Sequence, residues 1–163
     1  MGVEIERKFL VDHEKWRRLE KPRGAYLRQG YLAPEAKNTI RIRVADEQGY
    51  ITIKGLSSGI SRLEYEYLIP VAEATEMLDN LTQSDVEKVR YRINFSGHLW
   101  EVDEFSGDNA GLIMAEIELK AENEPFDKPD WITGEVSNDD RYYNSNLSKN
   151  PYRNWGAQQG NRV

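Results

Sequence analysis

The chain has 163 residues, a length that fits one domain with a buried core. Its net charge of −6 argues against binding to nucleic acid or to an anionic membrane surface, and the absence of cysteine excludes disulfides, zinc–thiolate sites and a cysteine nucleophile. Charged residues make up 31% of the chain, more than the usual figure of about a quarter, and the fold must accommodate this excess.

The first half of the chain alternates between apolar and polar residues with a period of two, which is the pattern of half-buried β-strands. A short stretch after the first strand has helical character instead, with Asp12 as its N-terminal cap. In chain order, the pattern predicts a strand near 3–11, a helix over 12–20, and strands near 25–33, 38–45, 49–55 and 61–69.

In the second half, Pro70 is typical of a helix start and precedes an apolar stripe with helical spacing. The predicted elements here are a helix over 71–81, strands near 86–96, 98–105 and 111–120, and a helix that follows Asp139 or Asp140 and carries Leu147. We expect a single domain over residues 1–155 and a flexible polar tail over residues 156–163.

Successive strand residues point to opposite faces, so the predicted strands sort their side chains into an apolar face and a charged face. The acidic members of the charged face are Glu4, Glu6, Glu64, Glu66, Glu101, Asp103, Glu116 and Glu118. Its basic members are Lys8, Arg41, Arg43, Lys54, Arg62, Lys88, Arg90 and Arg92. Acidic pairs occur on the first, fifth, seventh and eighth strands, and basic pairs on the third and sixth.

An antiparallel sheet with one solvated face is the simpler interpretation of any one of these strands. It does not explain why the polar positions hold almost only charged residues with segregated signs, since exposed ion pairs contribute only about 0–1 kcal/mol. We therefore predict a closed antiparallel β-barrel of eight strands, in which the charged face lines the lumen and the three helices cover the apolar outside.

Charges inside a barrel are tolerable only when they are paired, hydrated or bound to an ion, so a lumen with both signs indicates a charged ligand. Arg and Lys side chains bind phosphate oxygens, and the number of basic positions indicates several phosphates in a row. Carboxylates without His or Cys suit Mg²⁺ or Mn²⁺, which would bridge the acidic wall and a polyanion. This combination is the one that phosphoryl transfer requires.

The same residues resemble the CYTH domain, or triphosphate tunnel metalloenzyme, superfamily, and its short bacterial inorganic triphosphatases in particular. The resemblance begins with E-I-E-R-K at 4–8 and covers nearly the whole chain. Its further motifs are R-I-R at 41–43, T-I-K-G at 52–55, E-Y-E at 64–66, E-K-V-R-Y-R at 87–92, W-E-V-D-E-F at 100–105, A-E-I-E-L at 115–119 and E-V-S-N-D-D-R-Y-Y-N at 135–144. One departure is Ser137, where many relatives have Thr.

The resemblance implies a tunnel that hydrolyses a triphosphate-bearing small molecule with Mg²⁺ or Mn²⁺ as cofactor. It implies substrate binding by Lys8, Arg41, Arg43, Lys54, Arg62, Lys88 and Arg90, with Tyr31 as a further candidate. It implies metal binding by Glu116 and Glu118 together with Glu4 or Glu6, while Asp103 fits either carboxylate set. Glu64 and Glu66 are expected to orient the attacking water, with Lys88 and Arg43 as further catalytic residues.

Inorganic triphosphate is the expected substrate, with diphosphate and phosphate as products. Nucleoside triphosphate, thiamine triphosphate and cyclisation of ATP remain alternatives, as does a non-catalytic module that binds polyphosphate or nucleotides. The first residues lack the apolar stretch of a signal peptide, and no segment approaches the roughly 18 apolar residues of a membrane span. We expect a cytoplasmic monomer or homodimer that binds neither nucleic acid nor membranes.

Overall fold

The structure is a computed structural model that describes residues 2–33 and 37–161, with residues 157–161 described by their backbone alone. Within these ranges, no helix combines the length and the apolar character needed to cross a lipid bilayer. The last described residues belong to a 3-10 helix, η3 (Tyr152–Asn161), and residues 162–163 lie outside the described part. The division into a domain over 1–155 and a flexible tail over 156–163 therefore stays a prediction.

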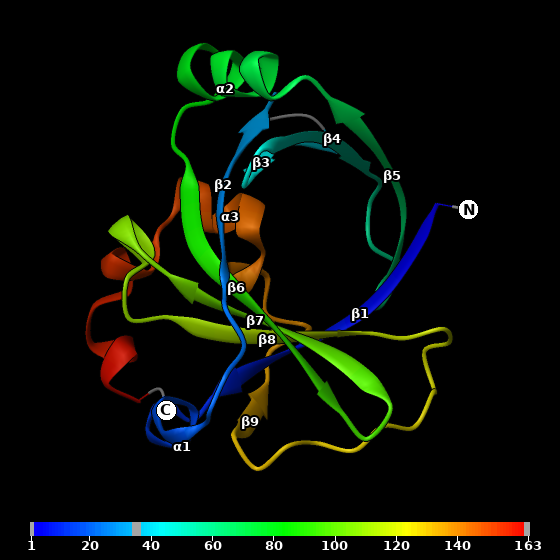
Figure 1. Ribbon diagram of the computed structural model, residues 1–163, viewed down its shortest axis with the longest axis vertical. Coiled ribbons are helices and arrows are strands. Elements are labelled where there is room, and N and C mark those ends of the chain that lie inside the picture. The colour runs from blue at the N-terminus through cyan, green and yellow to red at the C-terminus, as the bar shows by residue number, and fades with distance from the viewer. Residues whose placement is uncertain (1, 34–36, 162–163) are drawn as a thin grey trace.

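Eight antiparallel strands form a closed ring, which Figure 1 shows end-on. These strands are β1 (Val3–Val11), β2 (Ala25–Leu32), β3 (Thr39–Ala45), β4 (Gln48–Lys54), β5 (Ser61–Ile69), β6 (Val86–Phe95), β7 (His98–Phe105) and β8 (Ile113–Glu118). Their order around the ring is β5-β4-β3-β2-β6-β7-β8-β1, and β1 pairs with β5 to close it. The predicted eight-stranded barrel is confirmed.

A ninth strand, β9 (Ile132–Glu135), lies outside the ring and pairs with the end of β1, opposite Phe9 and Val11. The sequence did not predict this strand, because four residues are too few to establish an alternating pattern. β9 extends the sheet beyond the barrel and brings the C-terminal third of the chain back to β1.

Two helices cover the outside of the barrel, as predicted, and lie outside the ring in Figure 1. They are α1 (His13–Arg18) and α2 (Val71–Asn80). The predicted cap of α1 is present, since the Asp12 carboxylate accepts a hydrogen bond of 3.1 Å from the backbone N–H of Lys15. Trp16 of α1 is fully buried in an apolar cluster on the outer side of β1, β7 and β8. Leu78 of α2 packs against Ile42 of β3 in the same way.

The C-terminal segment differs from the prediction, because it closes one end of the lumen and does not cover the outside. It comprises η2 (Asp140–Tyr142), α3 (Asn144–Lys149) and the start of η3, and we call residues 140–155 the plug. Tyr142 and Leu147 of the plug are buried against Phe105 and Met114. By strand alternation, Met114 shares the face of Glu116 and therefore points into the barrel. In Figure 1, α3 lies within the outline of the ring.

A Leu147→Ala substitution is expected to lower the free energy of unfolding by about 2–5 kcal/mol, because Leu147 is fully buried in the plug and its truncation leaves a cavity. Urea denaturation followed by tryptophan fluorescence measures this change. The matched control is Leu81→Ala, since Leu81 is 61% exposed and its loss should change stability by less than about 0.5 kcal/mol. Equal effects of the two substitutions would contradict the packing of the plug inside the barrel.

Candidate functional site

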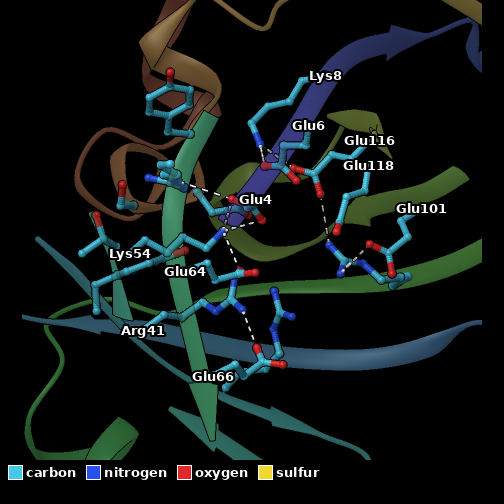
Figure 2. A pocket seen from close by; sticks show the side chains of 18 of the residues that line it. Glu4, Glu6, Lys8, Arg41, Lys54, Glu64, Glu66, Glu101, Glu116 and Glu118 are labelled. Atoms are coloured by element: carbon cyan, nitrogen blue, oxygen red, sulfur yellow. Dashed lines mark hydrogen bonds and ion pairs between the residues drawn. The ribbon is translucent and has the colours of Figure 1, made fainter. Parts of the chain in front are cut away.

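The barrel encloses a cavity of about 220 Å³ whose wall is almost entirely polar. All eight strands of the ring contribute lining side chains, which are Glu4, Glu6, Lys8, Tyr31, Thr39, Arg41, Arg43, Lys54, Arg62, Glu64, Glu66, Arg90, Arg92, Glu101, Glu116 and Glu118. The plug adds Tyr143, Asn144 and Ser145. The predicted charged face therefore points into the lumen, and Figure 2 shows its carboxylate and basic groups converging.

Of the site residues predicted from the sequence, Lys88 and Asp103 alone do not line this cavity. Both lie beneath its wall, with exposed fractions of 0% and 2%. Conversely, the plug residues, Thr39, Arg92 and Glu101 line the cavity without having been predicted as binding or catalytic residues, although Arg92 and Glu101 belonged to the predicted charged face. The plug residues could not be placed by alternation, because this rule applies to strands and says nothing about where a terminal helix packs.

Asp103 holds two buried cations in place. Its carboxylate accepts two hydrogen bonds of 2.8 Å from Arg90, and its Oδ2 lies 2.9 Å from Nζ of Lys88. Burial alone would raise the pKa of Asp103, but the charges of Arg90 and Lys88 outweigh it and lower the pKa to about 2. Because both carboxylate oxygens contact cations and Asp103 does not line the cavity, the structure favours a role as counterion for Asp103 over one as metal ligand.

Lys88 connects this counterion to the plug. Its ammonium group donates a hydrogen bond of 3.1 Å to Oδ1 of Asn144, which itself lines the cavity. Burial lowers the pKa of Lys88 to about 7, and Arg90 and Arg43 act in the same direction against the attraction of Asp103. The deep part of the lumen therefore carries more positive charge than its carboxylates neutralise.

Arg43 is the clearest case of an unmatched cation. Its Nε and one terminal nitrogen donate hydrogen bonds of 2.9 and 2.7 Å to Oε1 of Gln29, a neutral group. No carboxylate among the described residues forms an ion pair with it. Burial, with the nearby charges of Arg41 and Arg90, lowers the pKa of Arg43 to about 9. A partly buried guanidinium that lines the cavity, with cationic neighbours and no ion pair among the described residues, favours the binding of an anion.

Gln29 is a site residue that the sequence analysis missed. It is fully buried, accepts both hydrogen bonds from Arg43 and donates one of 2.9 Å to the Tyr31 hydroxyl. The signal was present, because Gln29 is two residues from Tyr31 and shares its face. A neutral amide did not stand out among so many charged residues.

The acidic side of the cavity is only partly neutralised. Nζ of Lys8 lies 2.7 Å from Glu6 and 2.5 Å from Glu116, as Figure 2 shows, and Nζ of Lys54 lies 3.1 Å from Glu4. Glu118 forms no such ion pair within the described part of the chain, and its pair partner across the strands is Glu6. Burial and the charges of Glu4, Glu64 and other carboxylates raise the pKa of Glu118.

This donor set fits a hard divalent cation, because it consists of carboxylate oxygens with an excess of negative charge at Glu118. In the described ranges, no three carboxylates or histidines converge closely enough to form a complete metal site. Mg²⁺ and Mn²⁺ are ordinarily held by a few carboxylates, with water or oxygens of a ligand in the remaining positions.

Glu64 and Glu66 lie on β5, next to Lys54 and Thr52 of the neighbouring strand β4. Oε2 of Glu66 accepts hydrogen bonds of 2.8 Å from Thr52 and 3.3 Å from Arg41. Oε2 of Glu64 lies 3.5 Å from Nζ of Lys54. Each carboxylate keeps one oxygen free of these contacts, which leaves it able to accept a hydrogen bond from a water molecule in the cavity.

An Asp103→Asn substitution is expected to lower the free energy of unfolding by about 3–5 kcal/mol near neutral pH, because it leaves Arg90 and Lys88 without their buried counterion. The pKa of Asp103 is about 2 in the fold and about 3.9 in an unfolded chain, so its stabilising effect is complete above about pH 4. This effect is lost as the pH falls towards 2. Denaturation curves between neutral pH and pH 2 measure both quantities.

The control for this substitution is Asp108→Asn, since Asp108 is an exposed partner of Arg153 and its loss should have little effect. The stability difference between the Asp103 variant and the wild type should shrink below pH 4. A difference that stays constant over this range would show that the carboxylate is not the ionised counterion described here.

The sequence and the structure of this chain are similar to those of known proteins. The CYTH domain family matches residues 2–150 of the chain. The chain is 54% identical over 156 residues to a protein named inorganic triphosphatase from Acetivibrio thermocellus, covering 95% of this chain and 99% of that protein. It is 38% identical over 151 residues to an inorganic triphosphatase from Nitrosomonas europaea, covering 90% and 97% of the two chains. A crystal structure of an inorganic triphosphatase has a TM-score of 0.63 and 32% identity, and covers 89% of this chain and 97% of that one.

Proposed function

Because the chain belongs to the CYTH domain family, we propose that it is a metal-dependent triphosphatase that hydrolyses inorganic triphosphate to diphosphate and phosphate. The observation that carries the proposal is the pair of unmatched charges that face one cavity. Arg43 lacks a counterion on the basic side, and Glu118 has an excess of negative neighbours on the acidic side. A polyanion together with a divalent cation satisfies both sides at once.

The basic side chains of the cavity would bind the phosphates. The cavity-lining residues proposed for this role are Lys8, Arg41, Arg43, Lys54, Arg62 and Arg90. Arg41 lines the cavity, and its buried Nε has no hydrogen-bond partner among the described residues. Tyr31 lines the same wall, and its hydroxyl can donate to a phosphate because it already accepts from Gln29. Lys88 would act from beneath the wall, through Asn144 and Asp103.

The carboxylates would divide into two groups. Glu116 and Glu118, with Glu4 or Glu6, would hold Mg²⁺ or Mn²⁺, and this cation would neutralise negative charge on the phosphates. Glu64 and Glu66 would accept hydrogen bonds from the attacking water and hold it against the terminal phosphorus. Arg43 would stabilise charge that develops on the diphosphate leaving group, since its own charge has no other partner. Positioning and electrostatics would supply most of the rate enhancement.

An assay of phosphate release from triphosphate, ATP and thiamine triphosphate, with Mg²⁺ and with Mn²⁺, tests the proposal. We expect turnover of triphosphate that is the fastest of the three and that stops when the cation is chelated. Faster release from ATP or thiamine triphosphate would assign the tunnel to that substrate, and formation of cyclic AMP would assign it to a cyclase. Binding of triphosphate without turnover under any of these conditions would indicate a binding module.

A further inference from the structure

Exposed apolar side chains gather on one part of the outside of the barrel. Five of them lie on three neighbouring strands, and we call this set the bare wall: Val3 of β1, Ile53 of β4, and Leu63, Tyr65 and Tyr67 of β5. Their exposed fractions are 51%, 36%, 53%, 47% and 57% in that order. From the sequence we expected helices to cover the apolar outside of the barrel, on which Tyr65 and Tyr67 lie. The structure leaves both in contact with solvent.

The bare wall is continuous. Val3 is paired directly with Leu63, and Ile53 is paired directly with Tyr65, so neighbouring strands place these side chains side by side. Tyr67 follows Tyr65 on the same face of β5. The intervening residues Glu64 and Glu66 point into the lumen, which removes charge from the outer face.

The wall remains uncovered because the available helices lie elsewhere. α1 packs over the outer side of β1, β7 and β8, and α2 packs over β3 and the start of β4. The third helix belongs to the plug and fills the end of the lumen. An exposed apolar patch of this size, rimmed by polar residues, is typical of an interaction surface.

We propose that a second copy of this chain covers the bare wall, so that two barrels associate face to face about a two-fold axis. A two-fold interface requires a surface that is complementary to itself, and an uncharged, aromatic-rich sheet face meets this requirement without pairing like charges. Two sheets packed in this way bury their facing side chains as in a β-sandwich. The net charge of −6 on each chain makes two copies repel each other, so an uncharged surface is the favourable place for them to meet.

The area of the bare wall is sufficient for such a dimer. Taking about 200 Å², the area of a fully exposed aromatic side chain, as an upper value for each residue, the five residues expose at most roughly 500 Å² per chain. A two-fold contact would then bury about 1,000 Å² in total, which is the lower limit for a specific interface. An anionic lipid surface or a charged partner fits less well, because the wall offers no charged side chain to attract it.

Dimerisation would also support the seam of the barrel. β1 and β5 close the ring through only a short stretch, in which Val3, Glu4 and Ile5 face Leu63, Arg62 and Ser61. The same stretch carries Glu4, Arg62 and Glu64 on the lumen side. A partner packed on Val3 and Leu63 would hold both strands of the seam from outside, without blocking either end of the lumen.

Light scattering coupled to size exclusion, over a dilution series of the full chain, tests the proposal. One chain has a mass of 18.9 kDa, and we expect the wild type to have twice this mass. Tyr67→Glu and, separately, Leu63→Glu should each weaken association by about 30-fold or more, since each places two like charges in the interface. Leu81→Glu is the matched control, because Leu81 is 61% exposed but lies at the end of α2, away from the wall. It should remain dimeric.

Circular dichroism and thermal unfolding of each variant show whether its fold is intact, and the mass of the wild type is informative without any variant. A wild type that has the mass of one chain at every concentration overturns the proposal. So does a dimer that persists in both wall variants, since its interface must then lie elsewhere. A monomeric wild type that binds neutral lipid vesicles, and loses this binding in Tyr67→Glu, would assign the wall to a membrane surface instead.

Discussion

Glu118→Gln is expected to reduce metal-dependent triphosphate hydrolysis by about 100-fold or more, while the protein stays folded. Glu118 forms no ion pair among the described residues, and burial together with the charges of Glu4 and Glu64 raises its pKa. A divalent cation relieves this repulsion, and replacing the carboxylate by an amide removes both the charge and one oxygen ligand. The substitution should not destabilise the fold without metal, since it removes a repulsive interaction.

Two measurements distinguish a metal ligand from a general structural role. Phosphate release is titrated with Mg²⁺ and Mn²⁺, and Mn²⁺ binding is measured by calorimetry without substrate. Glu118→Gln should weaken Mn²⁺ binding and keep the unfolding temperature of the wild type. Glu76→Gln, an exposed position on α2, is the matched control and should leave both quantities unchanged. Unchanged Mn²⁺ affinity in the Glu118 variant would remove Glu118 from the proposed ligand set.

Arg43→Gln is expected to reduce kcat by about 10²–10³-fold, because it removes a preorganised cation from the position where charge develops. The same substitution should leave the ligand-free protein equally stable, or more stable by up to about 2 kcal/mol. The reason is that the guanidinium is partly buried near Arg41 and Arg90 with no ion pair to a described residue, and its desolvation opposes folding.

Lower activity with retained stability is expected for a group that binds the substrate and destabilises the ligand-free protein. Thermal unfolding with and without triphosphate, in the absence of metal, measures it directly. Triphosphate should raise the unfolding temperature of the wild type and do so much less in Arg43→Gln. Arg153→Gln, at an exposed ion pair, is the control and should behave as the wild type does. A strongly destabilised Arg43 variant would show that the charge is compensated in the ligand-free protein.

The site of this protein could be predicted from its sequence to an unusual extent, because all but two of the proposed site residues line the cavity. The reason is geometric: on a strand, a residue two positions from a lumen-facing residue also faces the lumen. Glu4, Glu6 and Lys8 were assigned together in this way, and the structure places all three in the cavity wall. The same rule could not tell that Asp103 is sealed beneath that wall, because depth along the lumen depends on what fills its ends.

The sequence by itself determined which side chains share a face, how many strands close the ring, and that its lumen carries both signs of charge. These properties follow from the local period of two and need no knowledge of distant contacts. Only the tertiary structure decided that Gln29 holds Arg43, that Asp103 neutralises Arg90 and Lys88, and that residues 140–155 fill the end of the lumen. Those arrangements depend on contacts between residues far apart in the chain, for which the local pattern carries no information. The exposure of the bare wall was also decided by the tertiary structure, because it depends on where the helices pack and not on which residues the strands contain.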